Sequence, residues 1–428
     1  MKQIPRKGTL SRNQSLWEQL GPGLITGAAD DDPSGIATYS QAGAAFGYGL
    51  LWTTLFTWPL MVAIQMVCAR IGRVSGTGIA ANMRMYGRPG ILYGIVALLL
   101  IANTINIAAD IGAMGESLKL LIGGPAQFYA VLFGVVSLLL QVFVPFPRYS
   151  PFLKALTVAL FAYVATVFVV RVPWSQVLTR TLLPAVVWNV KYGVAIVAVF
   201  GTTISPYLFF WQASHEVEDQ RAAPKEQPLK DAPEQARRNL RRIKTDTYVG
   251  MAYSALIAFF IMLTAAVTLH AHGLTDVATS AQAAQALRPI AGRFAFYLFA
   301  AGIVGTGLLA VPVLAGSAAY AVAESFDWRV GLGRRPAQAR GFYAIIAIAT
   351  LLGVALNFTP VDPIKALFWS AVINGVIAVP IMVIVMLLSA RAEVMGRFVV
   401  TGRLRLLGWA ATVVMAAAVI VMFATWGS

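Results

Sequence analysis

The sequence predicts an all-α protein that crosses a membrane many times. Of its 428 residues, 58% are hydrophobic and only 12% are charged, whereas soluble domains usually carry about 25% charged residues. The mean hydropathy is +0.71. Apolar runs of about 20 residues, the length that a helix needs to span a bilayer, recur along the whole chain. This composition excludes a soluble enzyme, a nucleic-acid-binding protein and a disordered scaffold.

The apolar runs predict eleven helices in a single transmembrane domain, residues 22–428. This domain follows a basic segment, residues 1–21, that has no cleavable signal pattern and is expected in the cytoplasm. In order, the expected helices are 22–46, 50–70, 91–122, 126–146, 151–171, 191–213, 247–270, 294–324, 341–358, 364–389 and 404–426.

The basic residues predict how these helices are oriented. With a cytoplasmic N-terminus, 26 of the 33 Lys and Arg residues fall on the inner side and 7 on the outer side. The positive-inside rule therefore places the N-terminus inside the cell membrane and the C-terminus outside. It also accounts for the net charge of +15 without any nucleic-acid partner. The longest polar stretch, residues 216–246, predicts a solvated cytoplasmic loop that is partly helical around residues 234–244.

Two of the predicted helices are interrupted. The first contains GAADDDPSG at residues 27–35, and the sixth contains FGTTISPY at residues 200–207. Proline removes a backbone donor, and glycine lowers the cost of unwinding a helix. Three acidic residues inside a membrane helix are costly unless they face water, a partner or an ion.

The interrupted helices begin two sets of five helices, an arrangement typical of an inverted repeat with a binding site at the membrane midplane. For Asp32 the alternative role is helix capping, and Asp30 is expected to face the cytoplasmic vestibule. The expected substrate- or ion-binding residues, with Asp32 as the metal ligand, are Asp32, Asp31, Ser34, Gly35, Thr202, Thr203, Ser205 and Asn374.

The third predicted helix carries polar residues on one face, at Asn103, Asn106 and Asp110. We expect Asn103 to make an interhelical hydrogen bond. An intramembrane carboxylate is a candidate proton relay, so Asp110, Asn106 and Tyr207 are the candidates for a coupling or proton path.

The segment 32–43 reads DPSGIATYSQAG and is followed by Phe46-Gly47-Tyr48. This stretch resembles the signature of the NRAMP divalent-metal transporters, whose pattern is Asp-Pro-Gly-Asn-Phe-Ala-Thr, then Gln-Ala-Gly and Phe-Gly-Tyr. The resemblance extends over essentially the whole chain. It implies a LeuT-type fold with a 5+5 inverted repeat and an eleventh helix, and proton-coupled metal uptake.

The sequence departs from this family pattern at the ion site. The family's metal-binding Asn is replaced by Gly35, and its Met-Pro-His motif by Ser205-Pro206-Tyr207. A Glu three residues after the acidic residue of the third helix is replaced by Ala113. Loss of the soft Met ligand favours a hard cation, and the sequence also resembles the NRAMP-related magnesium transporters, which lack the same Met.

We therefore expect a secondary transporter of Mg²⁺ or Mn²⁺, with passive uptake because the His and Glu are absent. No resident cofactor is expected; the partners are the small inorganic ion and membrane lipids. The sequence leaves the oligomeric state open and is compatible with a monomer. One alternative is a small anion such as bicarbonate, bound by the helix N-termini at the breaks. Another is a non-transporting receptor. The sequence contains no recognisable nucleophile–base pair that would indicate an enzyme.

Overall fold

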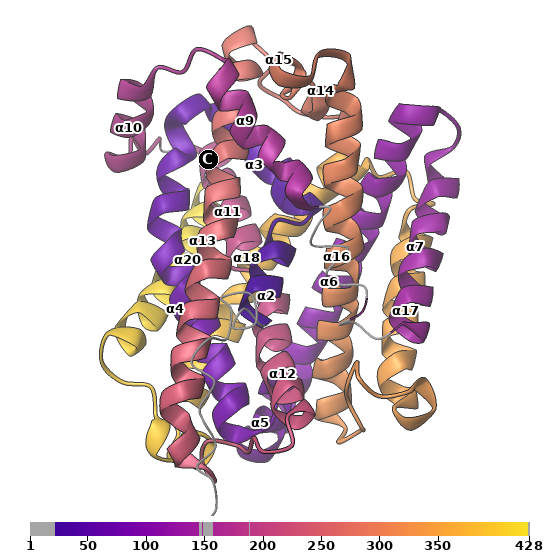
Figure 1. The fold of residues 1–428 in the computed structure, drawn as a ribbon. Helices are drawn as coiled ribbons and strands as arrows, with labels where there is room; N and C mark the ends of the chain where they lie inside the picture. The colour runs from indigo at the N-terminus through magenta and orange to yellow at the C-terminus, as the bar shows by residue number, and fades with distance from the viewer. Residues whose placement is uncertain (1–21, 145–147, 149–156, 188, 427–428) are drawn as a thin grey trace, which may run out of the picture.

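The computed structural model describes residues 22–144, 148, 157–187 and 189–426, and over these residues the protein is helical (Figure 1). Residues 1–21, residues 145 and 146 of the predicted fourth helix, and residues 151–156 of the predicted fifth helix lie outside the described residues. Each predicted span otherwise contains a helix: α2 (Pro22–Asp30) with α3 (Pro33–Phe46), α4 (Leu51–Ser75), α6 (Pro89–Ile122), α7 (Ala126–Phe143), α9 (Phe161–Val169), α11 (Val190–Thr203) with α12 (Pro206–Ala222), α13 (Ala236–Thr268), α16 (Ala295–Ser325), α17 (Arg340–Leu356), α18 (Pro363–Ser389) and α20 (Gly402–Thr425).

Local sequence sets many of these helix ends. The Asn189 side chain accepts a hydrogen bond from the Tyr192 amide at 2.8 Å and caps the start of α11. Asp362 caps α18 in the same way, accepting from the amide of Ile364 at 2.9 Å. Gly76, in the left-handed conformation, ends α4.

Short helices that the apolar runs did not predict lie in the connections between spans. They are α5 (Ile79–Tyr86), α10 (Trp174–Leu182), α14 (Ser280–Gln285), α15 (Arg288–Ala291) and α19 (Ala392–Met395). Figure 1 shows α10, α14 and α15 at one end of the bundle and α5 at the opposite end. None of them is long enough to give the apolar run by which a spanning helix is detected.

The two interrupted helices lie in the middle of the molecule (Figure 1). The α13 helix packs against both α2 and α3, and α18 packs against α11. Around them, α6 packs against α16, α7 and α17. The fold therefore surrounds both breaks with helices and keeps their unwound backbone away from lipid, as a membrane protein requires.

The stretch predicted as a solvated loop, residues 216–246, is largely helical and partly buried. The α12 helix continues to Ala222, and α13 already begins at Ala236. In the connection between them, Leu229 is fully buried and its amide donates to the Arg73 carbonyl at 3.2 Å. The Arg73 side chain forms an ion pair with Glu226. Composition alone did not predict these contacts, because a highly charged stretch is expected to be solvated.

Candidate functional site

The predicted breaks are confirmed, each at a proline. Helix α2 ends at Asp30 and α3 begins at Pro33, and α11 ends at Thr203 and α12 begins at Pro206. A proline fits the first position of a helix because its missing amide hydrogen would have no partner there. The amino ends of α3 and α12 and the carboxyl ends of α2 and α11 therefore meet near the centre of the bundle.

Asp32 caps the amino end of α3. Its Oδ1 accepts hydrogen bonds from the Ser34 hydroxyl at 2.6 Å and from the Gly35 amide at 2.8 Å. The Tyr207 hydroxyl, which donates to the Ala29 carbonyl at 2.9 Å, also lies 3.3 Å from Asp32 Oδ2. Since one hydroxyl hydrogen serves both acceptors, Oδ2 is the Asp32 oxygen with the weaker protein contact.

The residues of the second break supply hydroxyl groups to the same region. Thr202 Oγ1 lies 3.5 Å from the Ser34 hydroxyl, and Thr203 Oγ1 lies 3.0 Å from the hydroxyl of Tyr39. The Ser205 hydroxyl donates to carbonyls of its own chain segment, including that of Thr202 at 2.8 Å. Its oxygen lone pairs remain able to accept or to bind a cation.

Gly35 allows the two interrupted helices to approach each other closely. A Cβ atom at this position would lie 3.2 Å from the Asp30 carbonyl oxygen and 3.4 Å from Thr202 Oγ1. Even a methyl group here would require its neighbours to move slightly, so the absence of a side chain lets the two breaks pack closely. The predicted residues Asp32, Ser34, Gly35 and Thr202 thus come together.

Three other predicted residues have side-chain polar atoms without a hydrogen-bond partner. Asn374 on α18 is 1% exposed, and neither of its side-chain polar atoms has a hydrogen-bond partner. The same holds for Asp110 and Asn106 on α6, and Asp110 is close enough to Asp32 for an electrostatic interaction. Asn103, as expected, makes an interhelical hydrogen bond, to the Leu314 carbonyl at 2.9 Å.

Asp30 and Asp31 turn to a different neighbour, Ser254 on α13. The Ser254 hydroxyl donates to Asp30 Oδ2 at 2.5 Å and lies 3.3 Å from Asp31 Oδ1. Asp30 is fully buried rather than facing an open vestibule. Ser254 was not among the predicted residues, because nothing local marks one serine within a long apolar helix.

The residues at the breaks line none of three cavities found among the described residues. A groove of about 790 Å³ runs between α3, α11, α18 and the end of α20, and it reaches Ala37, one turn beyond Ser34. Its rim carries Lys191, Lys365 and Asp276. A second cavity of about 170 Å³ lies at the α5 end of the bundle, beside Glu324. The lining of neither cavity includes Asp32, which is 1% exposed.

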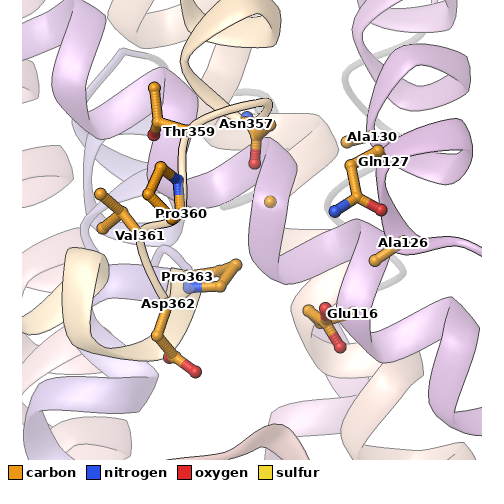
Figure 2. Close-up of a pocket in the computed structure, with 11 residues that line it drawn as sticks. Glu116, Ala126, Gln127, Ala130, Asn357, Thr359, Pro360, Val361, Asp362 and Pro363 are labelled. Carbon is orange, nitrogen blue, oxygen red and sulfur yellow. The ribbon is translucent and has the colours of Figure 1, made fainter.

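A third cavity, of about 320 Å³, lies away from the breaks (Figure 2). Glu116 from α6, Gln127 from α7 and Asp362 before α18 border it. Glu116 is paired with Lys119 at 3.2 Å, and Asp362 caps α18. Both carboxylates therefore already have a role in the local structure.

Sequence comparison gives one family match. The model of the family described as "Natural resistance-associated macrophage protein-like" matches residues 23–425. A protein of Klebsiella pneumoniae named "Divalent metal cation transporter MntH" is 28% identical over 397 residues, which cover 91% of this chain and 90% of that protein. A protein of the same name from Deinococcus radiodurans is 28% identical over 412 residues, covering 93% and 87%.

Solved structures share the fold at low identity. A manganese transporter of Eremococcus coleocola, in complex with an aromatic bis-isothiourea compound, gives a TM-score of 0.72 at 17% identity and covers 96% of this chain and 88% of its own. The transporter MhsT, in complex with L-phenylalanine, gives 0.59 at 13% identity, covering 95% and 98%. These likenesses show the fold, a LeuT-type arrangement of two five-helix repeats followed by an eleventh helix.

Proposed function

Because this chain belongs to the natural resistance-associated macrophage protein-like (NRAMP) family, we propose that it transports a hard divalent cation, Mg²⁺ or Mn²⁺, across the membrane. The relatives named as divalent metal cation transporters support the ion class. The chain is accordingly a membrane transporter and not an enzyme. The ion binds between the two breaks and is released by alternating access, as in other proteins built from inverted repeats.

One observation carries this proposal. Asp30, Asp31, Asp32 and Asp110 are fully buried or nearly so, and none of them forms an ion pair among the residues that the structure describes. Buried carboxylates without a basic partner are strongly unfavourable unless a cation or a proton compensates them. A protein that carries a divalent cation supplies that compensation in its loaded state.

The ligand chemistry favours a hard ion. The groups near the breaks offer only oxygen donors: Asp32 Oδ2, the hydroxyls of Ser34, Thr202, Thr203 and Ser205, and the Asp30 carbonyl oxygen next to Gly35. Asn374 adds an amide oxygen from α18. Oxygen donors with one or two carboxylates suit Mg²⁺ and Mn²⁺, and Mg²⁺ keeps several of its waters in such sites.

We further propose that uptake is passive. Tyr207 stands where the family resemblance places His, and a tyrosine does not exchange protons near neutral pH as His does. Asp110, Asn106 and Tyr207 are the residues through which protons would pass if coupling exists. Acidification of the vesicle lumen in proportion to metal uptake would overturn the passive mechanism.

The orientation that we propose is the one the basic residues predict, with the N-terminus in the cytoplasm. The groove that reaches Ala37 is then the outer approach to the site, and the connection between α12 and α13 lies inside. Reaction of a single cysteine introduced at Ala271, an exposed residue in the connection between α13 and α14, with an impermeant reagent added to intact cells tests this orientation, because the native Cys68 is buried.

A small anion such as bicarbonate is the rival substrate, since two helix amino ends meet at the breaks. The side chain of Asp32, however, already occupies the amino end of α3. A carboxylate at that place repels an anion, and this favours the cation.

Uptake into liposomes that contain a Mg²⁺- and Mn²⁺-responsive dye tests the proposal. We expect Asp32→Asn to abolish uptake, because Asn retains the cap but removes the charge. Asp231→Asn, an exposed site in the connection between α12 and α13, is the matched control and should behave as the wild type. Absence of divalent uptake by the folded wild-type protein would contradict the proposal and direct the next assay to bicarbonate.

A further inference from the structure

Asp30 and Asp31 lie at the end of a helix that disfavours them. Asp30 is the last residue of α2, and Asp31 follows it in the unwound segment. The carboxyl end of a helix carries partial negative charge, so a carboxylate there is repelled rather than stabilised. Both side chains are fully buried, and water therefore does not offset this repulsion.

The protein partners of this pair are incomplete. Ser254 is within hydrogen-bond distance of both carboxylates, at 2.5 Å from Asp30 Oδ2 and 3.3 Å from Asp31 Oδ1, but a hydroxyl has only one hydrogen to donate. Asp30 Oδ1 and Asp31 Oδ2 are buried and have no partner at all. The two carboxylates thus keep two buried oxygens without a partner, while their other oxygens share the Ser254 hydroxyl.

Close packing between α2 and α13 holds the pair in place. A Cβ atom on Gly27 would lie only 2.2 Å from the Gly250 carbonyl oxygen, so the two backbones are in direct contact. One turn earlier, the Gly23 amide donates to Asp246 Oδ2 at 2.7 Å. With α2 fixed on α13, Asp30 and Asp31 remain beside Ser254 and cannot turn toward solvent.

We propose that Asp30, Asp31 and Ser254 form a second cation position, on the α2 side of the break, that takes a hard divalent cation such as Mg²⁺ or Mn²⁺. The inference rests on the proposed function and adds a second stage to the same ion path. Two carboxylates match the charge of a divalent ion, and a serine hydroxyl and waters complete an all-oxygen ligand set.

This position joins two helices that belong to different parts of the fold. Asp30 and Asp31 come from α2, and Ser254 comes from α13. A cation bound there holds the carboxyl end of α2 against α13, and its departure leaves the repulsion between the carboxylates and the helix end uncompensated. The position therefore links ion occupancy to the contact between these two helices.

Counting Mn²⁺ ions bound to the purified full-length chain, from the electron paramagnetic resonance signal of the free ion, tests the inference. We expect two bound ions in the wild type and one in the Asp30→Asn/Asp31→Asn variant, whose remaining ion lies at Asp32. Asp32→Asn should also keep one, at the second position. Ser254→Ala should weaken the second position by about tenfold or more, whereas Asp231→Asn should change nothing.

The possible failures are distinguishable. If the wild type binds one ion and the double variant still binds it, the second position is wrong and the proposed function stands. If the wild type binds one ion and both the double variant and Asp32→Asn bind none, the carboxylates form a single shared site and the two-position inference is overturned. If the folded wild type binds none, both the inference and the proposed function fail.

Discussion

The two sides of the first break place the same residue type in opposite settings. On the α3 side, Asp32 lies at the amino end of a helix and accepts hydrogen bonds from Ser34 and Gly35. On the α2 side, Asp30 and Asp31 lie at a carboxyl end and share one hydroxyl. The helix end, rather than the side chain, decides which carboxylate the protein's own groups satisfy; the proposed cation would compensate the others.

The largest expected effect is the increase in thermal stability when a cation binds, which should be reduced by substitutions on either side of the break. A ligand at about 100 times its Kd stabilises a folded protein by about 2.7 kcal/mol per site. Excess Mn²⁺ should therefore raise the thermal stability of the wild type by nearly twice as much as that of Asp30→Asn/Asp31→Asn or Asp32→Asn. Thermal unfolding in detergent, with and without a chelator, measures this, and Asp231→Asn serves as control. Equal shifts in the wild type and the Asp30/Asp31 variant would remove the distinction.

A second prediction compares the packing on the two sides. Gly27→Ala places a Cβ against the backbone of Gly250 and should cost about 1–3 kcal/mol, because a backbone contact cannot yield without moving α2. Gly35→Ala meets its nearest atom at 3.2 Å and should cost less. Thermal unfolding of the two variants decides the order, and a larger loss for Gly35→Ala would contradict this account of how α2 is held.

The Asp32 cap on the α3 side is expected to contribute less to stability than the packing at Gly27. Asp32→Ala removes the side-chain acceptor and should lower the free energy of unfolding by about 1 kcal/mol, whereas Asp32→Asn, which caps equally well, should change it little. Chelator-treated protein must be used, so that loss of a bound ion does not enter the measurement. Similar losses in both variants would show that charge, and not capping, dominates at this position.

The smallest expected effect is a stabilisation, by a substitution on the α2 side. Without metal, Asp31→Asn should stabilise the protein by about 0.3–1 kcal/mol, since it removes a negative charge from a helix carboxyl end. In excess Mn²⁺ the wild type should become the more stable of the two. Unfolding curves under both conditions measure this reversal, and a loss of stability without metal would argue against an unfavourable setting for Asp31.

Several parts of the site could be predicted because their causes are local. Pro33 and Pro206 interrupt their helices whatever surrounds them, and Asp32 caps the turn that immediately follows it. Asn103 also behaves as expected for a polar group inside a membrane helix. Within residues 216–246, the helix predicted around residues 234–244 is confirmed by α13. The rest was not predicted, because the ion pair of Arg73 with Glu226 and the burial of Leu229 depend on contacts between segments distant in the sequence.

The sequence by itself determined that this chain is a helical membrane protein with two interrupted helices and acidic residues at one break, since hydropathy, proline and charge act over a few residues. Only the tertiary structure decided which partners those acidic residues have. Ser254 lies 224 residues beyond Asp30, and it meets the break because glycines at 27 and 250 let α2 and α13 approach closely. Such a register between distant helices follows from the packing of whole surfaces, which no local pattern encodes.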